Sequence, residues 1–144
     1  MNIKCIEIKY GSDFYNEQVQ LRTKVLREPL GLKFSEQELV FNHNEIHLAL
    51  LVNDKVEACL ILSPLNIEKI KMRQVAVSAN LQKLGLGRIL VEKAEEFARK
   101  LKYSEMVLNA RISALDFYLK MGYEVLGLPN EEIQIPHQKM RKSL

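Results

Sequence analysis

Two glycines and two cations mark a segment that could hold a phosphate group. Gly85 and Gly87 open an apolar helix-like pattern, with Lys83 before them and Arg88 after them. Glycine has no Cβ, so a ligand can approach its backbone closely. The unpaired N–H groups at the start of a helix also attract phosphate. The segment of residues 82–88 is therefore predicted to bind a pyrophosphate.

Two familiar nucleotide-binding patterns do not fit this segment. A P-loop needs Gly-Lys-Ser/Thr after its loop, and the chain contains no such sequence. A dinucleotide-binding fingerprint needs a third glycine, and Leu90 takes that position counted from Gly85. A tight turn with close helix packing is the structural alternative for the glycine pair.

The composition describes a chain of ordinary size and weak charge. It has 144 residues, the length of one domain, and 21 basic against 18 acidic side chains give a net charge of +3. So small a charge argues against nucleic-acid binding. No apolar run approaches the roughly 20 residues of a membrane helix. The first residues lack a signal peptide's apolar block. We expect one domain over residues 1–144, a cytoplasmic location, and neither a nucleic-acid nor a membrane partner.

The cysteines and histidines do not form a metal-binding pattern. Cys5 and Cys59 are the only cysteines, and both stand in apolar runs typical of buried reduced thiols. His43, Glu45 and His47 look like part of a zinc motif, but the glutamate is one place too late for H-E-x-x-H. We therefore expect no metal site.

Hydrophobic periodicity predicts five elements in the first half of the chain. Ser12 or Asp13 could cap a first helix, and Ser35 with Glu38 has the spacing of a capping box for a second. A turn sequence separates two later apolar runs, as in a β-hairpin. The predicted elements are a strand at residues 3–9, helices at about 12–27 and 34–43, and strands at 46–52 and 56–62.

The second half predicts a parallel strand–helix–strand unit. Residues 69–77 and 106–108 have strand character, and between them apolar side chains recur at helical spacing. The opposite, solvent-facing side of this helix is expected to carry Glu92, Lys93, Glu95 and Glu96. A helix at residues 113–121 and a strand pair at 123–126 and 138–141 complete the pattern.

Two motifs in this order of elements resemble the GNAT superfamily of N-acetyltransferases. Residues 82–87 resemble its Gln/Arg-x-x-Gly-x-Gly/Ala loop, and residues 114–123 its Ala-x-x-x-Tyr-x-x-x-Gly-Phe/Tyr helix. Residues 25–31 and the ending with His137, Met140 and Arg141 are similar to small bacterial members, many of unassigned substrate. The resemblance implies an α/β fold: a central mixed, splayed sheet of about six to seven strands, with helices on both faces.

The resemblance also implies how acetyl-CoA would be held. The backbone of Val75, Ala76 and Val77 would pair with the pantetheine arm like an added strand. The pyrophosphate would lie against residues of the following loop. These are Gln82, Lys83, Leu84, Gly85, Leu86, Gly87 and Arg88. Many relatives carry Asn seven residues before the tyrosine, whereas this chain has Arg111 there. Arg111 could reach a CoA phosphate, and Asn109 could contact the pantetheine arm.

The chemistry of acetyl transfer requires an acid, a base and an oxyanion donor. The departing thiolate leaves more readily when it is protonated, and Tyr118 is the candidate acid, with a core aromatic beside Phe117 as the alternative. The attacking amine must lose a proton first. Glu57, Glu68 and His137 are candidate bases, and a histidine has the most suitable intrinsic pKa. A backbone N–H near Val75 is the candidate oxyanion donor.

The sequence gives less information about the residues that would bind the acceptor than about those that would bind the donor. The first helix carries a charged, solvated face with Arg22, Lys24 and Arg27. Arg27 could instead bind a carboxylate of the acceptor, and Glu28 could bind a cationic amine. We predict an acetyl-CoA-dependent N-acetyltransferase acting on a small-molecule or peptide amine, and a homodimer is compatible with the late strands. The alternative is a non-catalytic acyl-CoA-binding or regulatory module.

Overall fold

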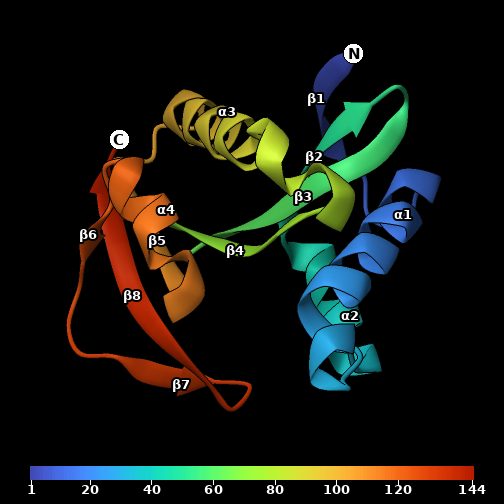
Figure 1. Ribbon diagram of the computed structural model, residues 1–144. Coiled ribbons are helices and arrows are strands. Elements are labelled where there is room, and N and C mark those ends of the chain that lie inside the picture. The colour runs from blue at the N-terminus through green and yellow to red at the C-terminus, as the bar shows by residue number, and fades with distance from the viewer. The chain divides into compact units, whose positions relative to one another are not determined.

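The computed structural model describes residues 1–144 and contains an open mixed β-sheet flanked by helices (Figure 1). The eight strands run in the order β1-β2-β3-β4-β5-β8-β6, and β7 pairs with β8. The strands are β1 (Ile3–Ile8), β2 (Ile46–Val52), β3 (Lys55–Pro64), β4 (Lys69–Val77), β5 (Glu105–Arg111), β6 (Glu124–Val125), β7 (Asn130–Glu132) and β8 (Ile135–Ser143). The expected α/β class and mixed sheet are confirmed, with one strand more than anticipated.

Four α-helices accompany the sheet, together with short helical turns. The α-helices are α1 (Asp13–Arg22), α2 (Glu36–Phe41), α3 (Leu86–Lys100) and α4 (Leu115–Lys120). The turns are η1 (Thr23–Arg27), η2 (Glu28–Leu30), η3 (Asn42–Asn44), η4 (Ala79–Leu84) and η5 (Ile112–Ala114). No helix combines the length and apolar character needed to cross a membrane.

The chain divides into two compact units. Unit 1 comprises residues 1–63 and 74–94, and unit 2 comprises residues 64–73 and 95–144. Strand β4 and helix α3 therefore contribute residues to both units. Each unit has its own share of the strands, helices and polar contacts.

Three antiparallel strands form the sheet of unit 1. β1 pairs with β2 from Ile3 opposite Val52, and β2 pairs with β3 around a two-residue turn. Asn53 and Asp54 make this turn with φ of 50° and 67°, the left-handed conformation of tight hairpins. The hairpin expected from the turn sequence is confirmed.

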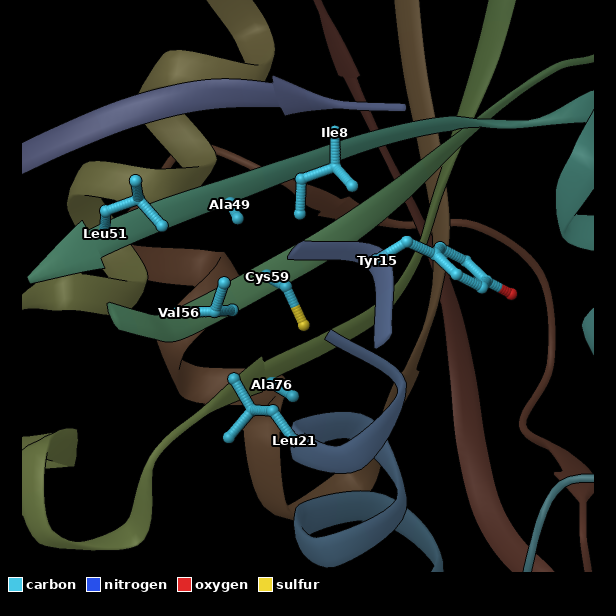
Figure 2. Packing of buried hydrophobic residues seen from close by; sticks show 8 residues of the cluster. All are labelled: Ile8, Tyr15, Leu21, Ala49, Leu51, Val56, Cys59 and Ala76. Atoms are coloured by element: carbon cyan, nitrogen blue, oxygen red, sulfur yellow. The ribbon is translucent and has the colours of Figure 1, made fainter. Parts of the chain in front are cut away.

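Helix α1 packs its apolar side chains against these strands. Figure 2 shows Leu21 of α1 beside Ala76 of β4, in a cluster of buried side chains. The cluster comprises Ile8, Tyr15, Leu21, Ala49, Leu51, Val56, Cys59 and Ala76. Burial raises the pKa of the Cys59 thiol to about 12, so this thiol stays neutral. Neither cysteine forms a disulfide, and Cys5 on the edge strand β1 is only half-buried.

The first two helices differ in how well their ends were predicted. Ser12 accepts a hydrogen bond from the Tyr15 N–H, so α1 begins where expected. It ends at Arg22, and the expected last turn is instead a π-helix, η1. Ser35 and Glu38 form the predicted capping box, and α2 begins directly after it.

Unit 2 contains the parallel pairing that the sequence predicted. Residues 69–72 of β4 pair in parallel with residues 105–108 of β5, and β5 pairs antiparallel with β8. β8 is longer than the expected 138–141, and β6 is shorter than 123–126. β7 was not anticipated. It forms a hairpin with β8 around Ile133 and Gln134, whose φ values are 46° and 65°.

One side chain expected at the surface of α3 is buried in unit 2. Glu95 is only 3% exposed. It accepts hydrogen bonds from the Tyr123 hydroxyl at 2.8 Å and from Lys142 Nζ at 3.0 and 3.1 Å. The solvent-facing assignment of Glu95 was therefore wrong. A buried carboxylate is stable here because a cation and a hydroxyl both pair with it.

Candidate functional site

The segment after β4 builds the predicted phosphate-binding loop within unit 1. The Ser78 N–H donates to the Glu57 carbonyl at 2.8 Å, which holds the end of β4. The turn η4 follows and ends at Gly85, whose φ of 79° is left-handed. A Cβ added at Gly85 would meet nothing within 4 Å, so the space beside this turn is open. Glycine is required here by conformation rather than by packing.

The side chains of the loop differ in their exposure. Lys83 and Arg88 are exposed, whereas Leu86 is buried as the first residue of α3. The Gln82 amide donates to the Val77 carbonyl at 3.1 Å, which ties the loop to the end of β4. Arg88 Nε donates to Glu92 Oε1 at 2.9 Å, one turn along the helix. The loop thus has a main chain held by hydrogen bonds and two exposed cations beside the start of a helix, a combination that suits an anion.

Tyr118 lies in α4 within unit 2 and is only 6% exposed. Its ring contacts Phe117 at 5.0 Å and Tyr123 at 5.6 Å between centroids, both edge-on. Burial raises the pKa of the Tyr118 phenol above its usual value, so the hydroxyl keeps its proton at neutral pH. The side chain therefore combines core packing with a protonated hydroxyl, which burial makes a weaker acid than that of free tyrosine.

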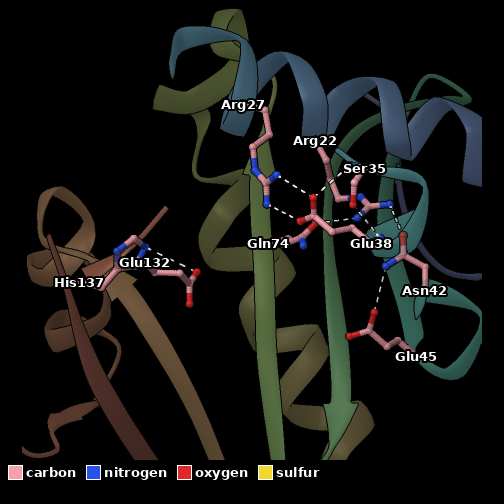
Figure 3. Close-up of polar contacts among 9 residues, drawn as sticks. All are labelled: Arg22, Arg27, Ser35, Glu38, Asn42, Glu45, Gln74, Glu132 and His137. Carbon is pink, nitrogen blue, oxygen red and sulfur yellow. Dashed lines mark hydrogen bonds and ion pairs between the residues drawn. The ribbon is translucent and has the colours of Figure 1, made fainter. Parts of the chain in front are cut away.

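His137 lies on β8 and faces Glu132 (Figure 3), and a hydrogen bond to the main chain defines its tautomer. Its Nδ1 is 2.8 Å from the Ile135 carbonyl oxygen. A carbonyl can only accept, so Nδ1 must carry the hydrogen. Nε2 is then the atom that can take up a proton, and it lies 3.8 Å from Glu132 Oε2 of β7. This arrangement has the form of a base oriented by a carbonyl and faced by a carboxylate.

Asn109 is engaged by the β7 hairpin rather than pointing away from the protein. Its amide and that of Asn130 exchange two hydrogen bonds of 2.9 Å. Asn109 Nδ2 also lies 3.2 Å from Glu132 Oε1, so the same carboxylate faces both Asn109 and His137. Arg111 stands opposite His137 in the β5–β8 register. The structure thus brings Asn109 and His137 together beside Glu132 in unit 2.

The two predicted acceptor residues have different surroundings in unit 1. Arg27 donates to both carboxylate oxygens of Glu38, at 3.2 and 2.8 Å, and its guanidinium lies 4.1 Å from the Phe34 ring centroid. The Arg27 guanidinium holds the pKa of Glu38 below its usual value. Glu28 is exposed at the start of η2. Arg27 therefore fastens α2 to η1, whereas Glu28 faces solvent.

A buried polar network in unit 1 escaped the sequence analysis. Arg22, expected on a solvated face, is 0% exposed. It donates to Gln74 Oε1 at 2.6 Å and to Asn42 Oδ1 at 2.8 Å (Figure 3). Asn42 in turn bonds Glu45 at 3.0 Å. Arg22 shares a helical face with buried Tyr15, and this spacing was the available signal.

The two histidines and the glutamate of the rejected zinc motif have other partners. His47 Nε2 is 2.8 Å from the Asn42 carbonyl, and Glu45 Oε2 accepts from the Ser63 hydroxyl at 2.7 Å. His43 packs edge-on against Tyr10. The structure contains no group of three or more His, Cys, Asp or Glu that could hold a metal ion.

The family model described as "Acetyltransferase (GNAT) domain" matches residues 30–144. The chain belongs to the GNAT acetyltransferase family. The match includes the loop at residues 82–88, Tyr118 and His137. The GNAT resemblance found in the two sequence motifs is therefore confirmed.

Individual relatives of this GNAT protein agree with the family match. The uncharacterized protein YyaT of Bacillus subtilis is 30% identical over 74 residues, which are 51% of this chain and 50% of that protein. The chain thus spans about half the length of this curated relative. An acyl-CoA N-acyltransferase of Pseudomonas aeruginosa has the same fold, with a TM-score of 0.83 and 22% identity over 98% of this chain and 99% of its own.

A GNAT family acetyltransferase from Elizabethkingia anophelis, solved with acetyl-CoA bound, is also similar. Its TM-score is 0.73 at 18% identity, covering 99% of both chains. These identities are low, so the two solved structures establish the common fold.

Proposed function

We propose that the protein is an acetyl-CoA-dependent N-acetyltransferase. It would transfer the acetyl group to a primary amine of a small molecule or peptide by direct attack. Membership of the GNAT family supports acyl transfer in general. The observation that carries the proposal is the loop after β4. There a left-handed glycine opens a helix beside exposed Lys83 and Arg88, with open space next to the turn.

The donor would be held mainly by the backbone. Residues 75–77 of β4 would pair with the pantetheine amides, and the N–H groups of residues 82–88 would bind the pyrophosphate. The fixed end of β4 supports this role, because bonds from Ser78 and Gln82 hold the main chain of Glu57 and Val77. The Asn109 side chain would contact the donor only if its hydrogen bonds with Asn130 broke. Arg111 is the second proposed contact from β5.

The acid and base roles fall to two buried side chains of unit 2. His137 would take a proton from the acceptor amine through Nε2, the atom left without hydrogen by the Ile135 bond. The amine nitrogen then attacks the thioester carbonyl, and an N–H near Val75 would stabilise the oxyanion. As the new C–N bond forms and the C–S bond breaks, Tyr118 would protonate the departing thiolate. The attacking nitrogen would release its second proton, and an equivalent proton from solvent would restore the Tyr118 phenol. Burial raises the pKa of Tyr118, so the phenol is protonated and is a weaker acid than free tyrosine.

The acceptor is proposed from charge. Glu28 is exposed in unit 1, and Glu132 has a half-exposed side chain in unit 2. Carboxylates attract an alkylammonium before it is deprotonated. A cationic amine therefore suits this chain better than an acidic one. Cytoplasmic location, where acetyl-CoA would be available, and a homodimer are proposed with it.

Calorimetric titration with acetyl-CoA tests the donor proposal. Micromolar or tighter binding is expected for the wild type. Gly85→Glu should abolish it, because a carboxylate would enter the phosphate loop. Gly31→Glu is a matched control, since Gly31 also has a left-handed φ, 70°, and no atom within 4 Å of an added Cβ. Gly31→Glu should bind like the wild type.

A screen of amines for CoA release tests turnover. Release of free thiol with a cationic amine supports the enzyme. Binding without turnover of any amine would favour the non-catalytic acyl-CoA-binding module, for which the packing of Tyr118 between two aromatic rings is the supporting observation. Folded protein that binds neither acetyl-CoA nor CoA would overturn both readings.

A further inference from the structure

The side chain of Arg22 is buried yet carries a full charge. It is 0% exposed, and burial lowers its pKa below that of a free arginine. The guanidinium lies 5.1 Å from the Phe34 ring centroid and 6.0 Å from that of Tyr15. A buried charge is costly unless hydrogen bonds compensate it. A charged side chain at this buried position therefore needs a structural or functional explanation.

Two hydrogen bonds fix the guanidinium between separate elements of unit 1. Nη2 donates to Asn42 Oδ1 at 2.8 Å, and Nη1 donates to Gln74 Oε1 at 2.6 Å. Asn42 is itself held, because its Oδ1 accepts from the Tyr15 hydroxyl at 2.8 Å and its Nδ2 donates to Glu45. Figure 3 shows Arg22 between Asn42 on one side and Gln74 on the other. The planar fork of an arginine can make both bonds at once.

Gln74 has an unusual backbone for a residue inside a strand. Its φ is 52°, in the left-handed region that a residue with a Cβ rarely adopts. The parallel ladder of β4 with β5 runs only from Lys69 to Met72, so the ladder ends just before this residue. Directly after it come residues 75–77, and Ala76 packs in the core beside Leu21. The left-handed residue thus sets the direction of the last three residues of β4.

We propose that Arg22 is a positioning residue for acyl-CoA binding that acts through Gln74. By bonding the Gln74 side chain, Arg22 holds the left-handed backbone that aims the main chain of residues 75–77 toward the donor. This inference rests on the proposed function, in which those residues pair with the pantetheine arm. Arg22 itself touches no substrate, since it is fully buried.

Calorimetric titration of four variants with acetyl-CoA tests the coupling, with urea unfolding measured on each. Gln74→Gly removes the side chain but adopts a left-handed φ freely, and should bind within about threefold of the wild type. Gln74→Ala also loses the hydrogen bond to Arg22, but alanine does not adopt a left-handed φ freely. This variant should bind acetyl-CoA about tenfold more weakly than the wild type. Arg22→Lys cannot make both bonds, and should also bind about tenfold more weakly.

The double variant Arg22→Lys with Gln74→Gly separates positioning from stability. It should bind as well as Gln74→Gly alone, because glycine no longer needs the arginine, although it unfolds at lower urea than the wild type. The same substitution at exposed Arg99 is the control and should leave the dissociation constant unchanged. Additive losses of affinity from Arg22→Lys and Gln74→Gly would overturn the proposal.

Three further results of these experiments also test the positioning role of Arg22. If Arg22→Lys does not fold, equal dissociation constants for Gln74→Ala and Gln74→Gly overturn the positioning role. If the wild type binds and Arg22→Lys binds equally, only this inference fails. If folded wild-type protein does not bind acetyl-CoA, the proposed function fails and this inference falls with it.

Discussion

At the scale of single residues, burial determines the chemistry that the side chains of unit 2 can perform. Burial raises the pKa of Tyr118, so its phenol stays protonated and gives up its proton less readily than a free tyrosine. His137 is 3% exposed, and the Ile135 carbonyl fixes which ring nitrogen carries hydrogen. Neither property is a feature of the residue type alone. Each follows from the neighbours that the fold supplies.

Removal of the Tyr118 hydroxyl should affect turnover far more than binding. Tyr118→Phe keeps the ring contacts with Phe117 and Tyr123, so acetyl-CoA should bind within about twofold of the wild type. The turnover number should fall about a hundredfold, because the thiolate loses its acid. Steady-state thiol release measures the turnover, and calorimetry measures the binding.

Tyr103→Phe serves as the control for this prediction. It removes a hydroxyl from a half-buried tyrosine of the same unit and should keep full turnover. Equal turnover of Tyr118→Phe and the wild type would assign Tyr118 to the core alone.

At the scale of elements, Arg141 ties three strands of unit 2 together. It extends from β8 and donates from Nη2 to Glu105 Oε1 of β5 at 2.9 Å, and it also pairs with Glu124 of β6. The Arg141 hydrogen bond lowers the pKa of the Glu105 carboxyl below its usual value. Because β6 has only two residues, this ion pair adds to the strand pairing that attaches β6 to β8.

The depressed pKa of Glu105 predicts a pH-dependent stability. A carboxyl with a lower pKa in the folded state stabilises the fold above its unfolded pKa, and this contribution is lost as the pH falls through the folded value. Glu105→Gln should lower the free energy of unfolding by about 0.5–1 kcal/mol at pH 7. Its deficit relative to the wild type should shrink as the pH falls from the unfolded pKa of about 4.3 through the lower pKa of the folded state.

Urea unfolding between pH 7 and pH 3 measures this difference. The deficit at pH 7 should also be smaller in 1 M NaCl, because salt screens a partly exposed ion pair. A deficit that is constant from pH 7 to pH 3 would show that charge at Glu105 does not stabilise the sheet.

At the scale of the whole molecule, donor binding should appear as added thermal stability. A ligand that binds only the folded chain at a hundred times its dissociation constant adds about 2.7 kcal/mol. For a chain of 144 residues this raises the melting temperature by about 5–10 °C. Differential scanning calorimetry with acetyl-CoA measures the shift.

Acetyl-pantetheine distinguishes the phosphate loop from the rest of the donor site. This compound keeps the thioester and the amides but lacks the pyrophosphate. It should raise the melting temperature much less than acetyl-CoA at the same concentration, because the N–H groups of residues 82–88 would lack their anion. An equal shift with both compounds would exclude the loop from donor binding.

The sequence by itself determined the elements whose signals are local. Ser12 and the Ser35–Glu38 pair marked helix starts, and Asn53-Asp54 marked the hairpin turn. Caps and turns depend on residues a few positions apart, so no distant contact is needed to predict them. The two motifs indicated the GNAT family for the same reason, because each is contiguous in the sequence.

Only the tertiary structure decided the placement of the charged side chains. Arg22 and Glu95 both had the pattern of a solvated helix face, and both are buried. Their partners, Gln74 at a distance of 52 residues and Lys142 at 47, stand far away along the chain. The short strand β7 places Glu132 beside His137. It could not be predicted from the sequence, because its residues have no hydrophobic pattern. A buried charge is stable only through partners that folding brings to it, and spacing along the sequence does not reveal them.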